Sequence, residues 1–314
     1  MKALVTGGAG FIGSNICRKL VSLGWFVRVV DNLSSGKEAN LADIRNKVEF
    51  IYADMGEPTV AAAAMKGIDV VFHHGAQVSV PASVEDPATT HRNCVDATFT
   101  LLMAARQAKI KRFVYAASSA AYGDDPVQPK VETMLPRPIS PYAIGKLAGE
   151  YYCSVFFKVY GLETISLRYF NVFGPRQDPK SQYAAAIPAF VTMLLNNKQP
   201  TIYGDGEQTR DFTYIDNVVH ANLLAANAPH TSGEVVNIAS GTSVTVNETV
   251  TLIAKLLGKS IKPTYTAERA GDVKYSSANI SLAKKIIGFE PVVPFNDGMA
   301  NVIDWYRKTV VVDG

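Results

Sequence analysis

A glycine-rich segment close to the N-terminus constrains the fold of this chain more than any other feature. The apolar run Ala3–Thr6 leads directly into Gly7–Gly13, which reads Gly-Gly-Ala-Gly-Phe-Ile-Gly, and helical spacing follows over Phe11–Leu23. The apolar face of this predicted helix consists of Ile12, Ile16, Leu20 and Leu23. A strand, a tight glycine turn and a helix in this order are typical of a dinucleotide site, because the backbone can approach a pyrophosphate at the helix N-terminus.

Asp31 indicates which dinucleotide the turn binds. It directly follows the next apolar run, Phe26–Val30. A carboxylate there accepts hydrogen bonds from the adenosine ribose hydroxyls and repels a 2′-phosphate, so we expect NAD rather than NADP. The residues that we place against the pyrophosphate are Gly7, Gly10, Phe11, Ile12 and Gly13.

Further apolar runs continue this alternation through the first half of the chain. They are Val48–Tyr52, Val70–Phe72, Phe113–Ala116 and Thr164–Leu167. Runs rich in β-branched residues and separated by helices indicate a parallel sheet that is covered on both faces. We therefore predict an α/β fold with a doubly wound parallel sheet, that is, a Rossmann fold.

Turn signals become denser after about Tyr169. They include Gly174-Pro175, Gly204-Asp205-Gly206 and Ser240-Gly241. Helical patterns persist, among them a capping box at Thr245–Glu248 and a final amphipathic helix at Asn296–Lys308. We expect an NAD-binding domain over residues 1–170 and a smaller mixed α/β substrate domain over residues 171–314, with some chain exchanged between the two.

Tyr142 and Lys146 lie at the start of a predicted helix that follows Ser140-Pro141. Positions i and i+4 share a helix face, so the phenol and the ammonium can point at one spot. The ammonium and a positive nicotinamide ring both favour the phenolate of a group whose ordinary pKa is about 10. Tyr142 can then accept the proton of an alcohol that loses a hydride. A hydroxyl of Ser118 or Ser119 can hydrogen-bond the reacting oxygen, because both follow the run Phe113–Ala116.

The composition narrows the range of partners. The 314 residues carry a net charge of +3, and 47% of them are hydrophobic while 19% are charged. This composition supports a substantial core and argues against disorder. The charge is too small and too evenly spread for a nucleic-acid partner.

The cysteines, the histidines and the hydropathy argue against a disulfide framework, a metal site and a membrane-spanning segment, respectively. Cys17, Cys94 and Cys153 form no close-spaced pair, which predicts reduced thiols. His73 and His74 lack metal-ligand spacing, so we expect no metal site. The N-terminal apolar run is too short for a signal peptide, and no run of about 18 apolar residues exists. We therefore expect a cytoplasmic protein with no membrane partner.

Several of these motifs together make the chain similar to the extended short-chain dehydrogenases/reductases, and within them to the nucleotide-sugar epimerases. The resemblance covers essentially the whole length. The segments that carry it are Thr6–Gly13, Asp31–Gly36, Asn93, Ser118-Ser119, Ser140–Lys146, Leu167–Gly174, Gly204–Gly206, Arg210–Phe212 and Arg269–Asp272.

The resemblance implies roles for individual residues. Those on the adenosine side would be Asp31, Asn32, Ser35, Gly36, Asp54 and Met55. Those on the nicotinamide side would be Gly75, Ala76, Asn93, Tyr142, Lys146 and Tyr169. Those that bind the nucleotide sugar would be Asn171, Tyr203, Arg210, Arg269, Asp272 and Ser276, with arginines suited to phosphate oxygens. The resemblance also implies a homodimer that pairs helices at Ala88–Ala108 and Tyr142–Tyr160.

The segment Ser118–Gly123 bears on the reaction. It is one residue shorter than the usual epimerase stretch, so counting back from Tyr122 selects Ser118 and counting forward selects Ser119. Similar dehydratases and decarboxylases have an acidic residue just after the active-site serine or threonine, whereas Ala120 and Ala121 follow here. The resemblance therefore implies 4-epimerisation of a UDP-hexose. Tyr142 would take the 4-hydroxyl proton while NAD accepts a hydride at C4 and later returns it.

Ser276 sharpens the expected substrate. At this position of the family a tyrosine would exclude a 2-acetamido group, and a serine leaves room for it. We expect interconversion of UDP-GlcNAc and UDP-GalNAc, with UDP-Glc and UDP-Gal also accepted. The alternatives are an NAD-dependent dehydratase, decarboxylase or reductase, and a non-catalytic sensor of the nucleotide sugar or of NAD.

Overall fold

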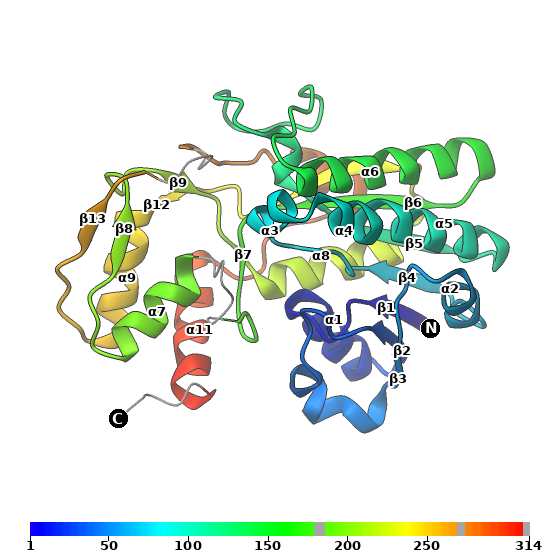
Figure 1. The fold of residues 1–314 in the computed structure, drawn as a ribbon, viewed down its shortest axis with the longest axis horizontal. Helices are drawn as coiled ribbons and strands as arrows, with labels where there is room; N and C mark the ends of the chain where they lie inside the picture. The colour runs from blue at the N-terminus through cyan, green and yellow to red at the C-terminus, as the bar shows by residue number, and fades with distance from the viewer. Residues whose placement is uncertain (179–185, 269–273, 310–314) are drawn as a thin grey trace.

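A parallel sheet forms the larger part of the computed structural model, which describes residues 1–178, 186–268 and 274–309 (Figure 1). This sheet has seven strands in the order β11-β6-β5-β4-β1-β2-β3, and every neighbouring pair is parallel. The strands are β1 (Lys2–Thr6), β2 (Phe26–Asp31), β3 (Glu49–Tyr52), β4 (Val70–His73), β5 (Arg112–Ser118), β6 (Thr164–Tyr169) and β11 (Glu234–Ile238). The predicted doubly wound α/β fold is thus confirmed.

Helices pack on both faces of this sheet because adjacent strand residues point to opposite sides. Leu4 and Val5 of β1 accordingly belong to different hydrophobic clusters. The cluster around Val5 includes residues of α1 (Phe11–Ser22) and α8 (Ile215–Asn227). The cluster around Leu4 includes residues of α2 (Pro58–Ala64), α5 (Ala97–Gln107) and α6 (Pro141–Tyr160). Shorter helical segments complete this part, namely η1 (Glu38–Lys47), α3 (Val80–Glu85), α4 (Pro87–His91), η2 (Arg92–Asp96) and η3 (Ser119–Tyr122).

The later part of the chain forms a smaller group of helices and short strands (Figure 1). Its helices are α7 (Ala186–Leu195), α9 (Val246–Leu257), α10 (Ser281–Ile287) and α11 (Phe295–Thr309). Its two-stranded sheets pair β7 (Val172–Phe173) with β10 (Thr213–Tyr214), β8 (Thr201–Tyr203) with β13 (Thr264–Thr266), and β9 (Thr209–Arg210) with β12 (Val244–Thr245). The capping box at Thr245–Glu248 is confirmed. Strand β11 nevertheless belongs to the main sheet, where it pairs with β6.

One expectation for the first helix is wrong. Leu23 does not belong to its buried face, because α1 ends at Ser22 and Leu23 is the C-cap with half of its surface exposed. Ile16 and Leu20 are fully buried, as their spacing predicts. Among the described residues, no helix combines the length and the hydropathy that crossing a membrane requires.

Candidate cofactor and active site

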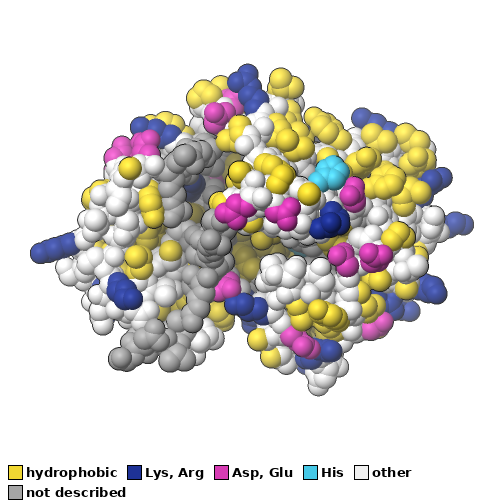
Figure 2. Space-filling view, viewed as in Figure 1, with side chains coloured by type: hydrophobic (Ala, Val, Ile, Leu, Met, Phe, Trp, Pro, Cys, Tyr) yellow, Lys and Arg dark blue, Asp and Glu magenta, His cyan; other side chains and the backbone are white. Residues whose placement is uncertain are grey.

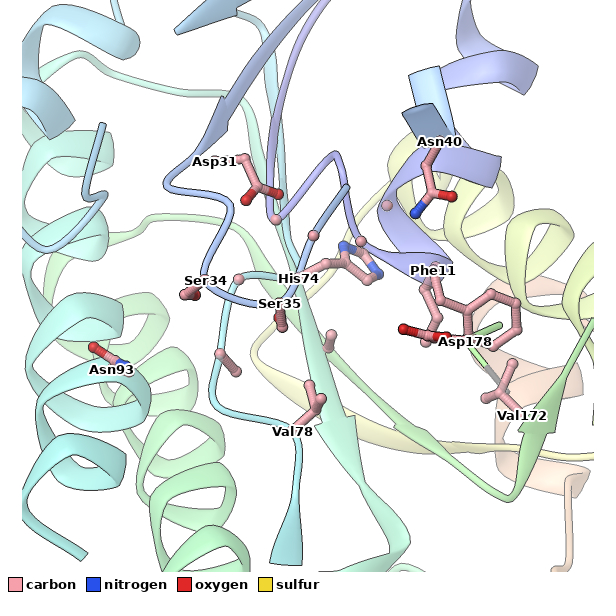
Figure 3. A pocket seen from close by; sticks show the side chains of 18 of the residues that line it. Phe11, Asp31, Ser34, Ser35, Asn40, His74, Val78, Asn93, Val172 and Asp178 are labelled. Atoms are coloured by element: carbon pink, nitrogen blue, oxygen red, sulfur yellow. The ribbon is translucent and has the colours of Figure 1, made fainter. Parts of the chain in front are cut away.

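A cavity of about 730 Å³ lies along the carboxyl ends of the central strands (Figure 3). Ligands occupy this edge in open parallel sheets. Every residue that the sequence analysis assigned to the cofactor lines the cavity: Gly7, Gly10, Phe11, Ile12, Gly13, Asp31, Asn32, Ser35, Gly36, Asp54, Met55, Gly75, Ala76, Asn93, Tyr142, Lys146 and Tyr169. Segments far apart in the sequence therefore share one wall.

The glycine turn is compact enough to require glycine at specific positions. Gly7 has a φ of +65°, and a Cβ atom on it would lie 2.7 Å from the backbone N of Gly75. A Cβ atom on Gly13 would lie 2.2 Å from the carbonyl oxygen of Gly7. Helix α1 begins with Gly10 as its N-cap, which has no side chain to cap the first N–H groups. Its N-terminus can therefore bind a phosphate.

Asp31 is fixed at the end of β2 with its carboxylate beside the turn. One carboxylate oxygen accepts a hydrogen bond from the Ala9 N–H at 2.9 Å, and the other accepts one from the Leu33 N–H at 2.8 Å. A Cβ atom on Gly36 would lie 3.0 Å from either oxygen, so glycine keeps this side of the carboxylate open. The glycine cradle and the fixed carboxylate fit a dinucleotide with an unmodified ribose.

The start of helix α6 places Tyr142 and Lys146 on the cavity wall. The Ser140 hydroxyl caps the helix by accepting the Ala143 N–H at 3.2 Å, and Pro141 is the first helical residue. The Lys146 ammonium donates to the Ala116 carbonyl at 2.8 Å and lies 5.1 Å from the centroid of the Tyr115 ring. Strand β5 therefore fixes the lysine that helix α6 presents.

Burial dominates the ionisation of this pair. Loss of solvation raises the pKa of Tyr142 to about 12, and a hydrogen bond with Ser118 acts in the opposite direction. Loss of solvation also lowers the pKa of Lys146, against which the negative charge of Glu150 acts. Tyr142 is therefore a protonated phenol in the protein alone, and its deprotonation requires additional positive charge nearby.

The two candidate serines occupy different positions. Ser118 ends β5, its hydroxyl accepts the Ala120 N–H at 3.2 Å, and its side chain acts to lower the pKa of Tyr142. Ser119 begins the short helix η3, and both serines line the cavity. Which of the two hydroxyls lies nearest the reacting oxygen therefore stays a prediction.

His74 contributes to the cavity in a way that sequence analysis did not foresee. Its Nε2 lies 2.9 Å from the Tyr169 hydroxyl, to which the side-chain amide of Asn222 donates at 2.8 Å. The His74 and Tyr169 rings are stacked with their centroids 5.9 Å apart. Loss of solvation lowers the pKa of His74 to about 3, so the ring is neutral near pH 7. Together with Asn222, His74 fixes the Tyr169 side chain at the cavity wall.

Contacts between distant segments lie beside the cavity. Lys37 and Asp178 form an ion pair at 2.5 Å, and Arg176 donates to the Asn15 side chain at 3.2 Å. The lining residues that sequence analysis missed are Val30, Ser34, Lys37, Asn40, Ala53, His74, Val78, Ala116, Ala117, Val172, Arg176, Gln177, Asp178 and Trp305. Several of them follow β2 or β7, and no local pattern marks them.

The predicted substrate residues are only partly brought to this cavity. Asn171 lines it, and its side chain donates to the Asp211 carbonyl at 3.3 Å. Tyr203 is the last residue of β8 and Arg210 is the last residue of β9, whereas Ser276 lies shortly after residues 269–273, which the structure does not describe. None of these three is among the described residues that line the cavity. Arg269 and Asp272 lie outside the described residues. The nucleotide-sugar contacts, that of Asn171 included, therefore stay predictions.

Known proteins are similar to this chain in both sequence and fold. The sequence pattern of the NAD dependent epimerase/dehydratase family matches residues 3–239. The UDP-glucose 4-epimerase of Mycolicibacterium smegmatis is 36% identical, over 98% of this chain and 99% of its own. The crystal structure of Thermotoga maritima UDP-glucose 4-epimerase with UDP-glucose has a TM-score of 0.94 and 38% identity, over 99% of this chain and 100% of its own.

A further solved structure is equally similar in fold. It is the UDP-N-acetylglucosamine 4-epimerase of Methanobrevibacter ruminantium in complex with UDP-N-acetylmuramic acid, with a TM-score of 0.94 and 40% identity over 98% of each chain. These matches span nearly the whole chain and agree with the glycine cradle, the carboxylate of Asp31 and the Tyr142–Lys146 pair. The chain therefore belongs to the NAD-dependent epimerase/dehydratase family.

Proposed function

We propose that this protein is an NAD-dependent UDP-hexose 4-epimerase. The observation that carries the proposal is the convergence of Ser118, Tyr142 and Lys146 on the cavity that contains the dinucleotide cradle. Ser119, Ala120 and Ala121 follow Ser118, so this segment supplies no carboxylate for the further proton transfers of a dehydratase. The relatives named as UDP-glucose 4-epimerases support the same reaction.

The side chains perform proton transfer at a single alcohol. When bound, NAD would supply a hydride acceptor for C4 of the sugar, and return of the hydride to the opposite face of C4 would give the 4-epimer. Tyr142 takes the proton of the 4-hydroxyl and gives it back, and its phenolate is stabilised by the nearby ammonium of Lys146. Ser118 orients the reacting oxygen by hydrogen bonding. Because no net oxidation occurs, we expect NAD to stay bound through many turnovers.

For the substrate, we propose UDP-GlcNAc and UDP-GalNAc, with UDP-Glc and UDP-Gal also accepted. The support is the small side chain of Ser276 and the similarity to the epimerase of Methanobrevibacter ruminantium. The test incubates purified protein with UDP-GlcNAc or UDP-Glc, without added reductant, and separates the products. The expected product is the 4-epimer of each. A 4-keto-6-deoxy sugar would instead indicate a dehydratase, and no product at all would indicate a decarboxylase, a reductase or a sensor. Release of CO₂ from UDP-glucuronate in a parallel reaction would identify the decarboxylase, and consumption of added NADPH would identify the reductase.

Replacement of Ser276 by tyrosine tests the sugar pocket. We expect kcat/KM for UDP-GlcNAc to fall by at least about tenfold, the effect of roughly 1.4 kcal/mol of lost binding, because the phenol competes for the space of the acetamido group. UDP-Glc should be affected much less. The matched control is Ser276→Ala, which should retain both substrates. An equal loss of both substrates in Ser276→Tyr would contradict this role.

We also propose that the active protein is a homodimer formed through α5 and α6. The two helices carry apolar side chains that are exposed in the single chain, and Figure 2 shows hydrophobic side chains gathered over this region. These residues are Phe99, Ile144, Tyr151, Val155 and Val159. Phe99 and Tyr152 already bring the two helices together, with ring centroids 5.3 Å apart. A contiguous apolar surface on two packed helices is typical of a subunit interface.

The dimer is tested by charging this surface. In the Tyr151→Glu, Val155→Glu double variant, burial of unpaired carboxylates should shift the protein to a monomer in sedimentation velocity. The control is Val292→Glu, which charges a residue of similar exposure outside the α5–α6 surface and should leave the sedimentation coefficient unchanged. A monomeric wild-type protein at micromolar concentration would refute the proposal.

Two broader assignments complete the proposal. Residues 1–170 would bind NAD and residues 171–314 would bind the nucleotide sugar. Two elements of the later segment nevertheless belong to the first part of the structure, because β11 is a strand of the main sheet and α8 packs on that sheet. We place the enzyme in the cytoplasm, since Cys17, Cys94 and Cys153 are all buried free thiols.

A further inference from the structure

A buried ion pair lies behind the proton-transfer residues and outside the cavity wall. Arg168 of β6 donates from Nε and Nη2 to the two carboxylate oxygens of Glu150 of α6, at 2.8 and 2.6 Å. The two residues expose only 3% and 2% of their surfaces. Charged groups are rarely buried so completely, and removing one member of such a pair leaves the other unsolvated. A contribution to folding stability is therefore a weak explanation for this buried ion pair.

The pair connects to Tyr142 through helix α6. Glu150 lies one helical turn beyond Lys146, which itself lies one turn beyond Tyr142, so the three side chains follow one face of α6. The bidentate contact therefore attaches this face of α6 to strand β6 in a fixed orientation.

The same arginine connects to Ser118 from the opposite side. Its guanidinium carbon lies 4.6 Å from the centroid of the Tyr122 ring, and Tyr122 belongs to η3, the turn that follows Ser118. The Tyr122 hydroxyl donates to the Asn237 side chain at 2.7 Å, which fixes the ring against β11. Arg168 thus contacts α6, which carries Tyr142 and Lys146, and η3, which directly follows Ser118.

We propose that Arg168 and Glu150 are positioning residues that set the placement of Ser118 relative to Tyr142 and Lys146. This inference rests on the proposed function, because it concerns proton transfer at Tyr142. Arg168 and Glu150 touch neither substrate nor cofactor in this role. They act through α6 and η3, and Glu150 also acts through its charge on Lys146.

The charge effect follows from the surroundings of Lys146. The titratable groups that contact Lys146 or interact with its charge are Glu150 and Cys153 on α6, Tyr115 on β5, His73 and His74 at the end of β4, and Cys94 on η2. Tyr142 lies one helical turn before Lys146 on the same face of α6. Among these described groups, Glu150 is ion-paired with Arg168, and its negative charge raises the pKa of Lys146 against the larger effect of burial. Loss of that charge would lower the pKa of Lys146, and the loss of Lys146 charge would raise the pKa of Tyr142.

Two variants separate geometry from charge. Arg168→Lys keeps both charges but loses the planar fork and its stacking on Tyr122. We expect kcat to fall about tenfold, which corresponds to an increase of roughly 1.4 kcal/mol in the activation barrier. KM should be unchanged, and so should the acid limb of the plot of kcat against pH. The double variant Glu150→Gln, Arg168→Met removes the pair without leaving a lone buried charge, so it should still fold. Its acid limb should move to higher pH.

A titration provides a readout that does not depend on turnover. The tyrosinate absorbance of the NAD-loaded protein is recorded against pH, and the Tyr142→Phe form of the same background is subtracted to isolate Tyr142. We expect this pKa to rise in the double variant and to stay unchanged in Arg168→Lys. The matched control is Arg112→Lys, a buried arginine at the opposite end of the sheet that is ion-paired with Glu163, and it should alter neither kcat nor the titration.

The outcomes distinguish this inference from the proposed function. If both variants fold, retain NAD and keep kcat within twofold of wild type with the same Tyr142 titration, the positioning role is refuted. If Arg168→Lys fails to fold, Tyr122→Leu serves in its place, because it removes the ring beneath the guanidinium and leaves the ion pair intact. Tyr122→Phe is its control. If wild-type protein epimerises no UDP-hexose, the proposed function fails, whereas the titration still tests the link to Tyr142.

Discussion

Replacement of Tyr142 by phenylalanine should lower kcat for 4-epimerisation by about 10²–10⁴-fold, the range that a positioned general acid–base group supplies. The phenol hydroxyl is the group that exchanges a proton with the substrate in the proposed mechanism, and phenylalanine has no group that can take its place. The ring itself remains, so the cavity keeps its shape. NAD measured after denaturation should stay at the wild-type ratio to protein.

The control for this variant is Tyr52→Phe, at the end of β3, whose side chain is exposed and does not line the cavity. It removes an equivalent hydroxyl and should leave kcat unchanged. An active Tyr142→Phe protein would exclude Tyr142 as the proton acceptor and would leave the NAD cradle without an assigned chemical partner. Loss of NAD from the variant would show that the substitution disturbs cofactor binding rather than proton transfer.

The cofactor side of the site could be predicted from the sequence because its determinants are local. The glycine turn, the strand before it and the helix after it occupy one continuous segment. Asp31 follows one strand later, at the same edge of the parallel sheet. The Tyr142–Lys146 pair could be predicted equally well, since helical spacing alone places both residues on one face. In each case the contacts depend on neighbours in the sequence.

The contacts behind the site depend instead on the order of the strands. Arg168 meets Glu150 and Tyr122 because β6 lies between β5 and β11, and no periodicity in the sequence specifies that order. The same limit applies to His74 and Tyr169, which come from the ends of separate strands. Residue type gave the opposite expectation for Arg168 and Glu150, because charged side chains are mostly exposed. Leu23 shows the converse error, because an apolar residue in helical register lies beyond the helix end and is exposed.

Substitution of Gly13 by alanine should abolish retention of NAD through purification. The new Cβ atom would lie 2.2 Å from the carbonyl oxygen of Gly7 and 2.8 Å from the Cα atom of Gly8. Both are backbone atoms, so the clash cannot be relieved by a side-chain rotation and the turn must move. Overpacking costs about 1–3 kcal/mol even where side chains can adjust. If the displaced turn costs about 3 kcal/mol of the free energy of NAD binding, the affinity for NAD falls more than about 100-fold.

Gly24→Ala is the matched control, because it places a methyl group at a glycine with no atom within 4 Å. Gly24 has a φ of +74°, so alanine there costs stability of about 1 kcal/mol through backbone strain but lies outside the cavity. Isothermal titration of NAD into both variants after removal of bound cofactor, with thermal unfolding in parallel, separates the two effects. We expect Gly24→Ala to lose melting temperature and keep wild-type affinity, and Gly13→Ala to lose affinity. Wild-type affinity in Gly13→Ala would show that the pyrophosphate does not lie against this turn, and the assignment of every cofactor contact along the cavity would then need to be redrawn.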